Sequence, residues 1–413
     1  MTMNDDKTES KLSLLIKDHI EAVTATYGTL SDEGNEKDLF LMGLRKALQE
    51  AFPSAMGAPK IDDDIVSCVG QTSLVRINNL EKDDRVAEVV AKVEFTNPAL
   101  SVKDRIAREM IEVAEKEGKI KPGVHTIVDI TSGNTGIAYG MVAAAKGYKA
   151  IQIIPEPYSV ERRTLMKAFG VDVVVTKKED GIPGAIKVYK ETLDRLGDAG
   201  YAPRQFDNPA NLKAHMEHTG PEIWEQTGGQ IDCIVTGMGT GGTLSGVTKF
   251  LRSKNPNFKA IAVEPMEASL LNGDKPGPHG IQGISPPFLP TNACVDELDE
   301  VIRCPTAEAM ATARKLAKEE GIACGISAGA NVWSALQVAK RPEMKGKRIV
   351  TFLCSQAERY FSTPLYQDLM EEAKALPLAT FDPETNIEGM VDLHSLESHK
   401  AAGTVFRPGF KVV

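Results

Sequence analysis

The sequence predicts an α/β protein with two domains, each an open and mostly parallel sheet flanked by helices. From about residue 90, short β-branched runs alternate with stretches in which apolar residues recur at helical spacing. Apolar strands that alternate with helices are typical of parallel sheets covered on both faces. The chain has 413 residues, 42% of them hydrophobic, so it can bury the cores of two or three domains.

The expected elements follow one another in a regular order. Residues 1–58 carry two helix-like stretches, LSLLIKDHIEAV and KDLFLMGLRKALQEAF, which predict a helical extension. Beyond it, the expected strands are VAKVEF, HTIVDI, YKAIQIIP, VDVVVT, DCIVTG, KAIAVEP and KRIVTFL. We assign residues 59–95 and 210–370 to a large domain, residues 96–209 to a smaller mobile domain, and residues 371–413 to a tail.

Composition and charge argue against several classes of partner. The net charge of −9 opposes binding to nucleic acid, because phosphate contacts need a basic surface. No apolar run reaches the length of about 18 residues that spans a bilayer. The acidic N-terminus, MTMNDDKTES, lacks the pattern of a leader peptide. We therefore expect a cytoplasmic protein without nucleic-acid or membrane partners.

Cysteine and histidine positions indicate no metal site. None of the six cysteines forms a CxxC pair. Cys233, Cys324 and Cys354 lie in apolar segments, where we expect small core residues. His215 and His218 are three residues apart but have no companion ligand cluster. The sequence thus predicts no bound metal ion.

A lysine near a helix start is an unusual feature of LSVKDRIAREM. Ser101 can cap the helix and Asp104 can complete a capping box, which places Lys103 in the first turn. The helix dipole disfavours a cation there by about 0.3–1 kcal/mol. A lysine held at that position is expected to have a lowered pKa, although an isolated lysine of this kind is most often a solvated side chain.

A glycine-rich turn follows the strand in CIVTGMGTGGTLSGVTKFL. The strand ends at Gly237 and a helix begins near Leu244, with small residues and threonines between them. Converging backbone N–H groups, a helix N-terminus and two hydroxyls make such a turn a phosphate cradle. The residues of this cradle are Gly239, Thr240, Gly241, Gly242 and Thr243.

The same turn contains a GxGxxG pattern, which leaves a second interpretation open. Gly237, Gly239 and Gly242 match the pattern. Glu264 ends the next strand, where an acidic residue would bind the ribose of a dinucleotide. On this alternative the protein is a nicotinamide-dependent dehydrogenase. The threonines that crowd the turn and its position in the middle of the chain weaken the alternative. A plain structural turn is a third interpretation.

Two further strand ends carry polar side chains. In VDITSGNTGIAYG a cluster of donors lies between the strand end at Thr131 and a helix start near Gly136, namely Ser132, Asn134 and Thr135. Such a cluster suits binding of a carboxylate, or simple capping of the helix. In VTFLCSQAERYFST a buried strand leads to Ser355, whose hydroxyl is expected to face the same crevice. Taken alone, Ser355 is better explained as a cap.

Together, these features predict a specific cofactor. Schiff-base chemistry with an aldehyde requires a neutral amine, which Lys103 can supply. A phosphate cradle, a carboxylate site and such an amine suit a cofactor that has one phosphate and one aldehyde and that acts on amino acids. That cofactor is pyridoxal phosphate.

Seven motifs closely resemble those of the cysteine synthase and cystathionine β-synthase family, the fold-type II pyridoxal phosphate enzymes. The motifs are NPALSVKDRIA, TSGNTGIA, QFDNPAN, GTGGT, GPHGIQGI, GISAGA and ERYFST. They occur in the family's order and cover roughly residues 65–370. QFDNPAN, GPHGIQGI and ERYFST are more similar to cysteine synthases than to cystathionine β-synthases.

The resemblance implies roles for individual residues. Lys103 would hold the cofactor and act as the catalytic base, Asn134 would bond to the ring hydroxyl, and Ser355 would meet the pyridine nitrogen. The cofactor phosphate would lie in the cradle of residues 239–243. The substrate α-carboxylate would be bound by Thr131, Ser132, Thr135 and Gln205.

The implied reaction is a β-replacement. O-acetyl-L-serine would lose acetate to give an aminoacrylate intermediate, and sulfide would add to it to give L-cysteine. The smaller domain would close over the substrate. We expect a homodimer, with the helical extension as a dimer arm. Alternatives with another donor or acceptor are cystathionine β-synthase, cyanoalanine synthase and phosphoserine sulfhydrylase. Intact Lys103, Asn134 and Ser355 argue against a scaffold that has lost catalysis.

The chain departs from the family pattern around the substrate entrance. After GPHGIQGI it reads SPPF, residues 285–288, where the family has small, glycine-rich residues, and its two prolines are expected to stiffen the segment. Tyr158 replaces a usual methionine and Ser73 a usual proline, while Cys354 and Ala357 replace proline and glycine. These differences bear on the donor and the acceptor and leave the β-replacement chemistry intact.

Overall fold

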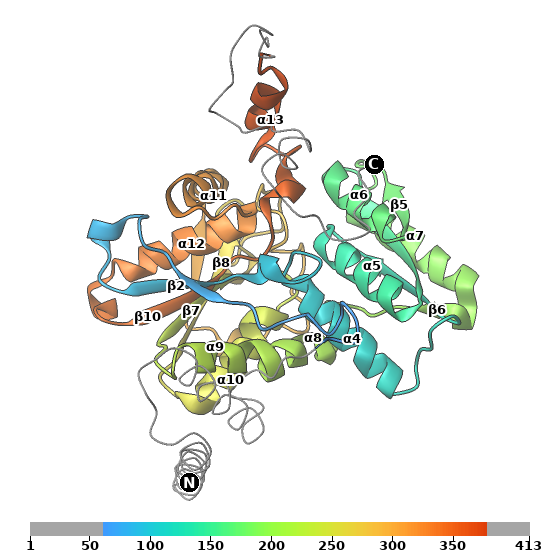
Figure 1. Ribbon diagram of the computed structural model, residues 1–413, viewed down its shortest axis with the longest axis horizontal. Helices are drawn as coiled ribbons and strands as arrows, with labels where there is room; N and C mark the ends of the chain where they lie inside the picture. The colour runs from blue at the N-terminus through green and yellow to red at the C-terminus, as the bar shows by residue number, and fades with distance from the viewer. Residues whose placement is uncertain (1–60, 378–413) are drawn as a thin grey trace, which may run out of the picture.

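The computed structural model describes residues 61–377, which form two sheets (Figure 1). The larger sheet has six strands in the order β1-β2-β10-β7-β8-β9, and only β1 runs antiparallel to its neighbour. Its strands are β1 Leu74–Arg76, β2 Glu88–Lys92, β7 Cys233–Gly237, β8 Lys259–Pro265, β9 Glu300–Cys304 and β10 Arg348–Phe352. The expected N-terminal helices and the tail beyond residue 377 lie outside the described residues.

The smaller sheet has four parallel strands in the order β5-β4-β3-β6. Its strands are β3 Thr126–Ile130, β4 Lys149–Pro155, β5 Asp172–Thr176 and β6 Gly200–Tyr201. Alternate residues of the central strands enter two different cores: Ile127 and Ile154 pack in one cluster, and Val128 and Ile153 in another. Both faces of β3 and β4 are therefore buried, which is why most residues of these strands are apolar.

Helices cover both sheets. In Figure 1, α11 and α12 lie on one side of the six-stranded sheet and α9 and α10 on the other. The helices next to the smaller sheet include α5, α6 and α7. The described α-helices are α4 Lys103–Lys116, α5 Asn134–Lys146, α6 Val160–Ala168, α7 Gly181–Leu196, α8 Pro209–Ala214, α9 Gly220–Gln226, α10 Gly242–Lys254, α11 Thr306–Glu320, α12 Ile326–Ala339 and α13 Gln367–Lys374. None of the helices in residues 61–377 has the length and apolar character needed to cross a membrane.

The α/β class with mostly parallel sheets is confirmed, and each of the seven expected strands is present. The first expected strand, VAKVEF, is shifted and runs over Glu88–Lys92. Three strands escaped the prediction: β1 and β6 have only three and two residues, and β9 carries charged residues that interrupt its apolar pattern. Helices α5 and α10 each begin two residues earlier than expected, at Asn134 and Gly242. The division into a large and a small mobile domain stays a prediction.

Candidate active site

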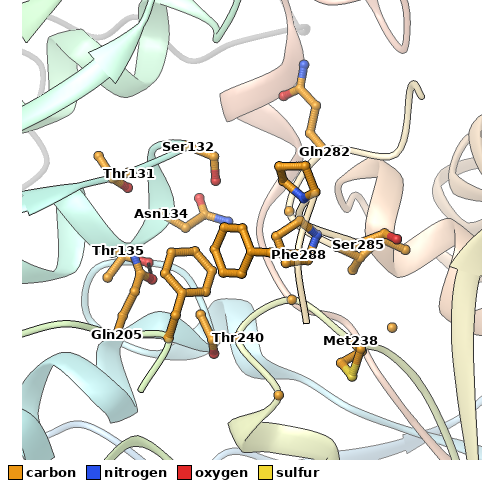
Figure 2. A pocket seen from close by; sticks show the side chains of 18 of the residues that line it. Thr131, Ser132, Asn134, Thr135, Gln205, Met238, Thr240, Gln282, Ser285 and Phe288 are labelled. Carbon is orange, nitrogen blue, oxygen red and sulfur yellow. Dashed lines mark hydrogen bonds between the residues drawn. The ribbon is translucent and has the colours of Figure 1, made fainter. Parts of the chain in front are cut away.

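A cavity of about 660 Å³ lies where the carboxyl ends of strands from both sheets meet. Its lining includes the ends of β3 and β7, the first residue of α4 and the segment 285–288. Figure 2 shows the loop from Thr131 to Thr135 on one wall, facing Gln282 and Phe288 across the opening. Ligands of open α/β folds bind at such a position.

The cavity brings together most of the residues that the sequence singled out. Ten of the 12 predicted site residues line it, all except Gly242 and Ser355. Gly242 is the first residue of α10 and is buried directly behind the glycine turn. The structure therefore brings these residues together at one cavity, whereas the role of each residue stays a prediction.

Lys103 begins α4 and lines the cavity. Its amine has no hydrogen bond or ion pair among residues 61–377. Burial lowers the pKa of Lys103, and the nearby Cys354, Glu94 and Asp104 partly oppose the shift. The helix dipole predicts a shift in the same direction, and the structure adds desolvation by burial as a cause.

The start of α4 differs by one residue from the expected capping box. Its N-cap is Val102 and not Ser101, because Ser101 pairs with Ser355 in an isolated β-bridge. The Ser101 hydroxyl still accepts the Lys103 N–H at 3.3 Å, and it donates to Asp104 Oδ1 at 3.3 Å. Asp104 Oδ2 accepts the N–H of Ala99 at 2.6 Å. These contacts fix the backbone that carries Lys103.

The glycine turn after β7 is packed so closely that side chains are excluded at two positions. A Cβ on Gly239 would lie 2.5 Å from the carbonyl oxygen of Gly283, and Gly241 has a φ of +88°. The turn leads directly into α10, whose first N–H groups have no partners within the helix. Asn211 Nδ2 donates to Thr240 Oγ1 at 2.9 Å and so fixes this hydroxyl. The turn can accept a phosphate group.

A buried histidine supports the last residue of the cradle. Thr243 Oγ1 lies 3.1 Å from His215 Nε2, and His215 Nδ1 lies 2.9 Å from Thr219 Oγ1. Burial lowers the pKa of His215 well below its usual value, so its ring is neutral at neutral pH. Both ring nitrogens of His215 thus have hydroxyl partners, and one of these is Thr243. His218 does not take part, because its Nε2 lies 3.5 Å from a carboxylate oxygen of Glu109.

Hydrogen bonds of Thr131, Thr135 and Gln205 fix the conformation of the loop after β3. The Thr131 hydroxyl accepts two backbone N–H groups of the loop, at 2.9 and 3.1 Å. Thr135 donates to Gln205 Oε1 at 2.7 Å, and Gln205 Nε2 donates to the carbonyl at the end of β3 at 2.9 Å. The Ser132 side chain and the N–H groups that begin α5 remain available at the cavity, where they suit a carboxylate.

Ser355 lies behind the cavity wall. Its side chain is fully buried, and its Oγ lies 2.9 Å from the hydroxyl of Tyr360. The expectation that its hydroxyl faces the crevice is therefore corrected for this structure, because Ser355 is fully buried and does not line the cavity. A contact between Ser355 and a cofactor ring stays a prediction. The neighbouring Cys354 packs against a core cluster, as expected, and also lines the cavity.

Glu264 does not reach the cavity. Its buried carboxylate accepts the hydroxyl of Ser269 at 2.8 Å, the N–H of Leu271 at 2.9 Å and the hydroxyl of Ser285 at 3.3 Å. All these bonds serve the loop after β8, so no acidic side chain is presented to a ribose at this position. The structure thus removes the acidic residue on which the dehydrogenase alternative depended.

The segment 285–288, whose sequence differs from the family pattern, forms the wall opposite the Thr131–Thr135 loop. Ser285 has a positive φ of 49°, and its hydroxyl donates to the carbonyl of Ala268 at 3.1 Å. Phe288 packs edge-on against Phe206, with ring centroids 5.0 Å apart. Two prolines and this aromatic contact make the wall stiff and apolar.

Several residues of the site were missed by sequence reasoning. Asn211 and His215 hold the cradle from behind, and Phe206 contributes to the entrance. Asn211 and Phe206 belong to QFDNPAN, so the motif contained the signal, but nothing in it indicates which residue each side chain contacts. Arg359, which contacts Asn134, gave no signal apart from its place in ERYFST.

Known proteins share this fold and sequence. The chain matches the family described as pyridoxal-phosphate dependent enzymes over residues 65–355. Cysteine synthase 3 of Caenorhabditis elegans is 46% identical over 321 residues, 77% of this chain and 94% of that protein. Cysteine synthase of Staphylococcus aureus is 48% identical over 310 residues, 75% of this chain and 98% of that protein.

Solved structures give the same result. The crystal structure of cysteine synthase from Entamoeba histolytica superposes with a TM-score of 0.72 at 39% identity, covering 75% of this chain and 92% of that chain. The crystal structure of O-ureido-L-serine synthase superposes with a TM-score of 0.70 at 38% identity, covering 83% of this chain and 100% of that chain. Both superpositions thus cover three quarters or more of this chain.

Fold and cavity together define an α/β enzyme with a lysine, a glycine turn and a polar loop around one site. The chain belongs to the family of pyridoxal-phosphate dependent enzymes. The residues present fit pyridoxal phosphate, because the unpartnered amine of Lys103 and a turn too tight for side chains line the same cavity. The expected cofactor is thereby confirmed.

Proposed function

We propose that the chain is a cysteine synthase, which makes L-cysteine and acetate from O-acetyl-L-serine and sulfide. The observation that carries the proposal is the Lys103 amine, which is unpartnered in residues 61–377 and shares one cavity with the glycine turn and the Thr131–Thr135 loop. Relatives named cysteine synthase are similar to the chain over nearly their whole length, which supports the same chemistry.

Each predicted residue has a place in this proposal. Pyridoxal phosphate, when bound, withdraws electrons from the Cα of an amino acid and so acidifies its proton. Lys103 would hold the cofactor, the cradle of residues 239–243 its phosphate, and Asn134 and Ser355 its ring. The polar loop and Gln205 would orient the substrate carboxylate, which places Cα near the Lys103 amine. This amine, with its lowered pKa, accepts the Cα proton and returns it after sulfide has added at Cβ.

The charges of the cavity favour an acetyl ester over a phosphate ester as the donor. Apart from Lys103, the only arginine or lysine in its lining is Arg204. Arg204 is already paired with Asp207, with Nε 3.1 Å from Oδ1. A dianionic leaving group therefore meets no unpaired cation in the described part of the cavity, whereas acetate and hydrosulfide need much less charge compensation.

Product formation from matched substrates tests the proposal. Purified protein is supplied with O-acetylserine, serine or phosphoserine, each combined with sulfide, homocysteine or cyanide, and the products are identified by mass spectrometry. We expect the fastest reaction with O-acetylserine and sulfide. A faster reaction with serine and homocysteine, with cyanide, or with phosphoserine would replace this proposal by the corresponding alternative enzyme.

Replacement of the lysine tests the site itself. We expect Lys103→Ala to lower turnover by about 100- to 10,000-fold, because the general base is lost. Lys119→Ala, which removes an amine that is 62% exposed, is the matched control and should leave turnover unchanged. Borohydride reduction followed by peptide mapping should place the cofactor on Lys103. A label on another lysine contradicts the assignment.

We also propose that the protein is a homodimer and that it acts in the cytoplasm. Each chain would contain the large domain and the smaller mobile domain that were assigned from the sequence. Exposed apolar side chains near the end of the described chain support an association surface: Phe361 is 42% exposed and Leu369 41% exposed. In Figure 1, α13, which carries Leu369, projects from the body of the molecule. Light scattering of the full-length protein should give twice the 44.6 kDa of one chain, and a fluorescent fusion should report the compartment.

A further inference from the structure

A buried arginine contacts one of the predicted cofactor ligands from behind. Arg359 lies in the short 3-10 helix η8, Ala357–Tyr360, and only 1% of its surface is exposed. Its Nη1 donates to Asn134 Oδ1 at 2.6 Å, and its Nη2 donates to the carbonyl of Ala99. The guanidinium of Arg359 thus connects the segment after β10 with two other parts of the chain: the start of α5 at Asn134, and the segment before Lys103 at Ala99.

This contact determines the orientation of the Asn134 amide. A guanidinium has only donors, so the amide must turn its oxygen toward Arg359. The amide nitrogen, which is also a donor, is then directed away from Arg359. Figure 2 shows the Asn134 nitrogen on the side that faces the cavity. Without Arg359, the reverse orientation, with the oxygen toward the cavity, has no comparable penalty.

The surroundings of Arg359 keep this contact in place. Burial lowers the pKa of Arg359 to about 10, so the group remains a cation at neutral pH. The neighbouring Asp104 favours the charge, while Arg162 opposes it. A cation at the amide oxygen also polarises the amide, which makes its N–H groups stronger donors. Ser159 anchors the backbone, because its hydroxyl donates to the carbonyl of Arg359 at 2.8 Å.

We propose that Arg359 is a positioning residue, which turns the Asn134 amide so that its N–H groups donate into the cavity to an anionic oxygen on the ring of pyridoxal phosphate. The inference rests on the proposed function, since it uses the role proposed for Asn134. Arg359 does not line the cavity, so it would act through Asn134 and not by direct contact.

A double-mutant cycle on the full-length holoenzyme tests the proposal. The dissociation constant of pyridoxal phosphate is measured by equilibrium dialysis for wild type, Arg359→Gln, Asn134→Ala and the double variant. Loss of one hydrogen bond of about 1.4 kcal/mol corresponds to a tenfold change. We expect Arg359→Gln to weaken binding about tenfold in the wild-type background and less than about twofold in the Asn134→Ala background.

Two further variants separate orientation from structural damage. Arg359→Lys keeps a donor-only cation at the amide oxygen, so its cofactor binding should stay within about threefold of wild type. The pH dependence of its cofactor absorption spectrum should also stay unchanged, whereas Arg359→Gln should shift that spectrum. Ser362→Ala removes a 2.7 Å hydrogen bond to Glu161 in the segment that follows η8 without touching Arg359, and should leave both quantities unchanged.

The outcomes distinguish this inference from the proposed function. Equal losses from Arg359→Gln with and without Asn134 would overturn it, because Arg359 would then not act through Asn134. So would equal losses from Arg359→Lys and Arg359→Gln, or an unchanged spectrum in Arg359→Gln. If the wild type binds no pyridoxal phosphate, the proposed function itself fails. If the wild type forms cysteine while the cycle is additive, only the role of Arg359 fails.

Discussion

At the scale of residues, desolvation governs the titratable groups around the cavity. Burial lowers the pKa of Lys103 and raises the pKa of Asp104, the next residue in the chain, to about 7. Both shifts favour the neutral form of the side chain. For Lys103 the neutral form is the reactive one. Burial in the protein, and not a neighbouring positive charge, is therefore what favours the neutral amine.

Asp129 gives this effect a measurable consequence for stability. Its Oδ1 accepts the N–H of Ile130 at 2.8 Å, and its Oδ2 is buried without a hydrogen bond in the described part of the chain. Burial raises the pKa of Asp129 to about 7, from 3.8 for an ordinary aspartate. At pH values between 3.8 and about 7, Asp129 is deprotonated in the unfolded state but still protonated in the folded state. The contribution of Asp129 to stability therefore falls as the pH rises.

We therefore expect Asp129→Asn to gain stability relative to wild type as the pH rises from 5 to 8. The gain should be on the order of a few kcal/mol, because each unit of pKa shift corresponds to about 1.4 kcal/mol. Asparagine keeps the acceptor for Ile130 and carries no charge. Urea unfolding of both proteins at several pH values measures the difference. A difference that stays constant with pH, or that decreases, contradicts the prediction.

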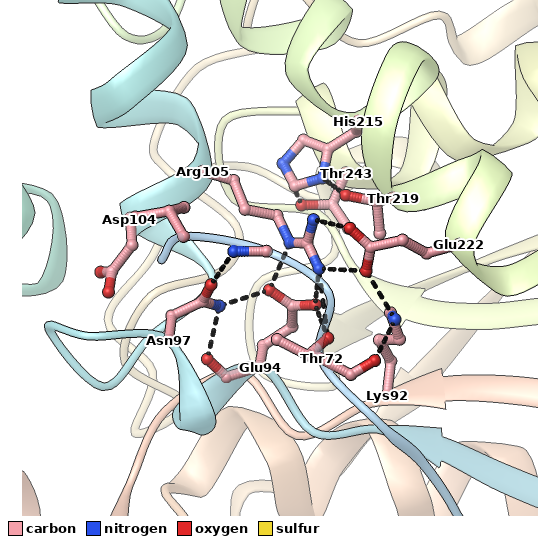
Figure 3. Close-up of polar contacts among 12 residues, drawn as sticks. Thr72, Lys92, Glu94, Asn97, Asp104, Arg105, His215, Thr219, Glu222 and Thr243 are labelled. Atoms are coloured by element: carbon pink, nitrogen blue, oxygen red, sulfur yellow. Dashed lines mark hydrogen bonds and ion pairs between the residues drawn. The ribbon is translucent and has the colours of Figure 1, made fainter. Parts of the chain in front are cut away.

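At the scale of elements, a buried ion-pair network ties α4 to the larger sheet (Figure 3). Arg105, two residues after Lys103, lies between Glu94 and Glu222, at 2.7 Å from a carboxylate oxygen of each. Lys92 in β2 joins the network through Glu222, also at 2.7 Å. Arg105 and Glu94 are almost completely buried, so each charge depends on its partners.

Removal of the central cation should therefore be costly. We expect Arg105→Met to lower the free energy of unfolding by about 3–5 kcal/mol, because two carboxylates lose their buried partner. The matched control is Arg76→Met, which breaks the pair with Glu88 where the arginine side chain is 67% exposed, and which should cost at most about 1 kcal/mol. Denaturant unfolding compares the two. Similar losses in both variants would show that the network around Arg105 contributes little.

The same elements show which parts of the site could be predicted from sequence. The cradle of residues 239–243 and the Thr131–Thr135 loop each follow a recognisable strand, so the rule for parallel sheets places them together. The contact of Arg359 with Asn134 joins residues 225 positions apart, and no local pattern encodes it. The cavity contact of Cys354 and the buried position of Glu264 were missed for a related reason: an apolar or strand-end residue can face a cavity or a core, and only tertiary packing decides between them.

At the scale of the whole molecule, the two sheets provide opposite walls of one cavity. The smaller sheet supplies the Thr131–Thr135 loop, and the larger sheet supplies the glycine turn after β7. Lys103 was assigned to the smaller, mobile domain from the sequence. The Arg105 network instead anchors the first turn of α4 to segments next to the larger sheet. Any closure of the smaller sheet should therefore move the loop toward an amine that stays in place.

We accordingly expect a substrate carboxylate to pull the Thr131–Thr135 loop toward Lys103, because the N–H groups that begin α5 would bind it. Crystal structures of the holoenzyme with and without an unreactive amino acid, superposed on the six-stranded sheet, measure the movement. Strands β3 to β6 should shift as a unit while the Cα of Lys103 keeps its position. An amino-acid amide, which has no carboxylate, is the control and should leave the structure open. If Lys103 shifts together with β3, α4 belongs to the moving part, and the Arg105 network does not anchor it.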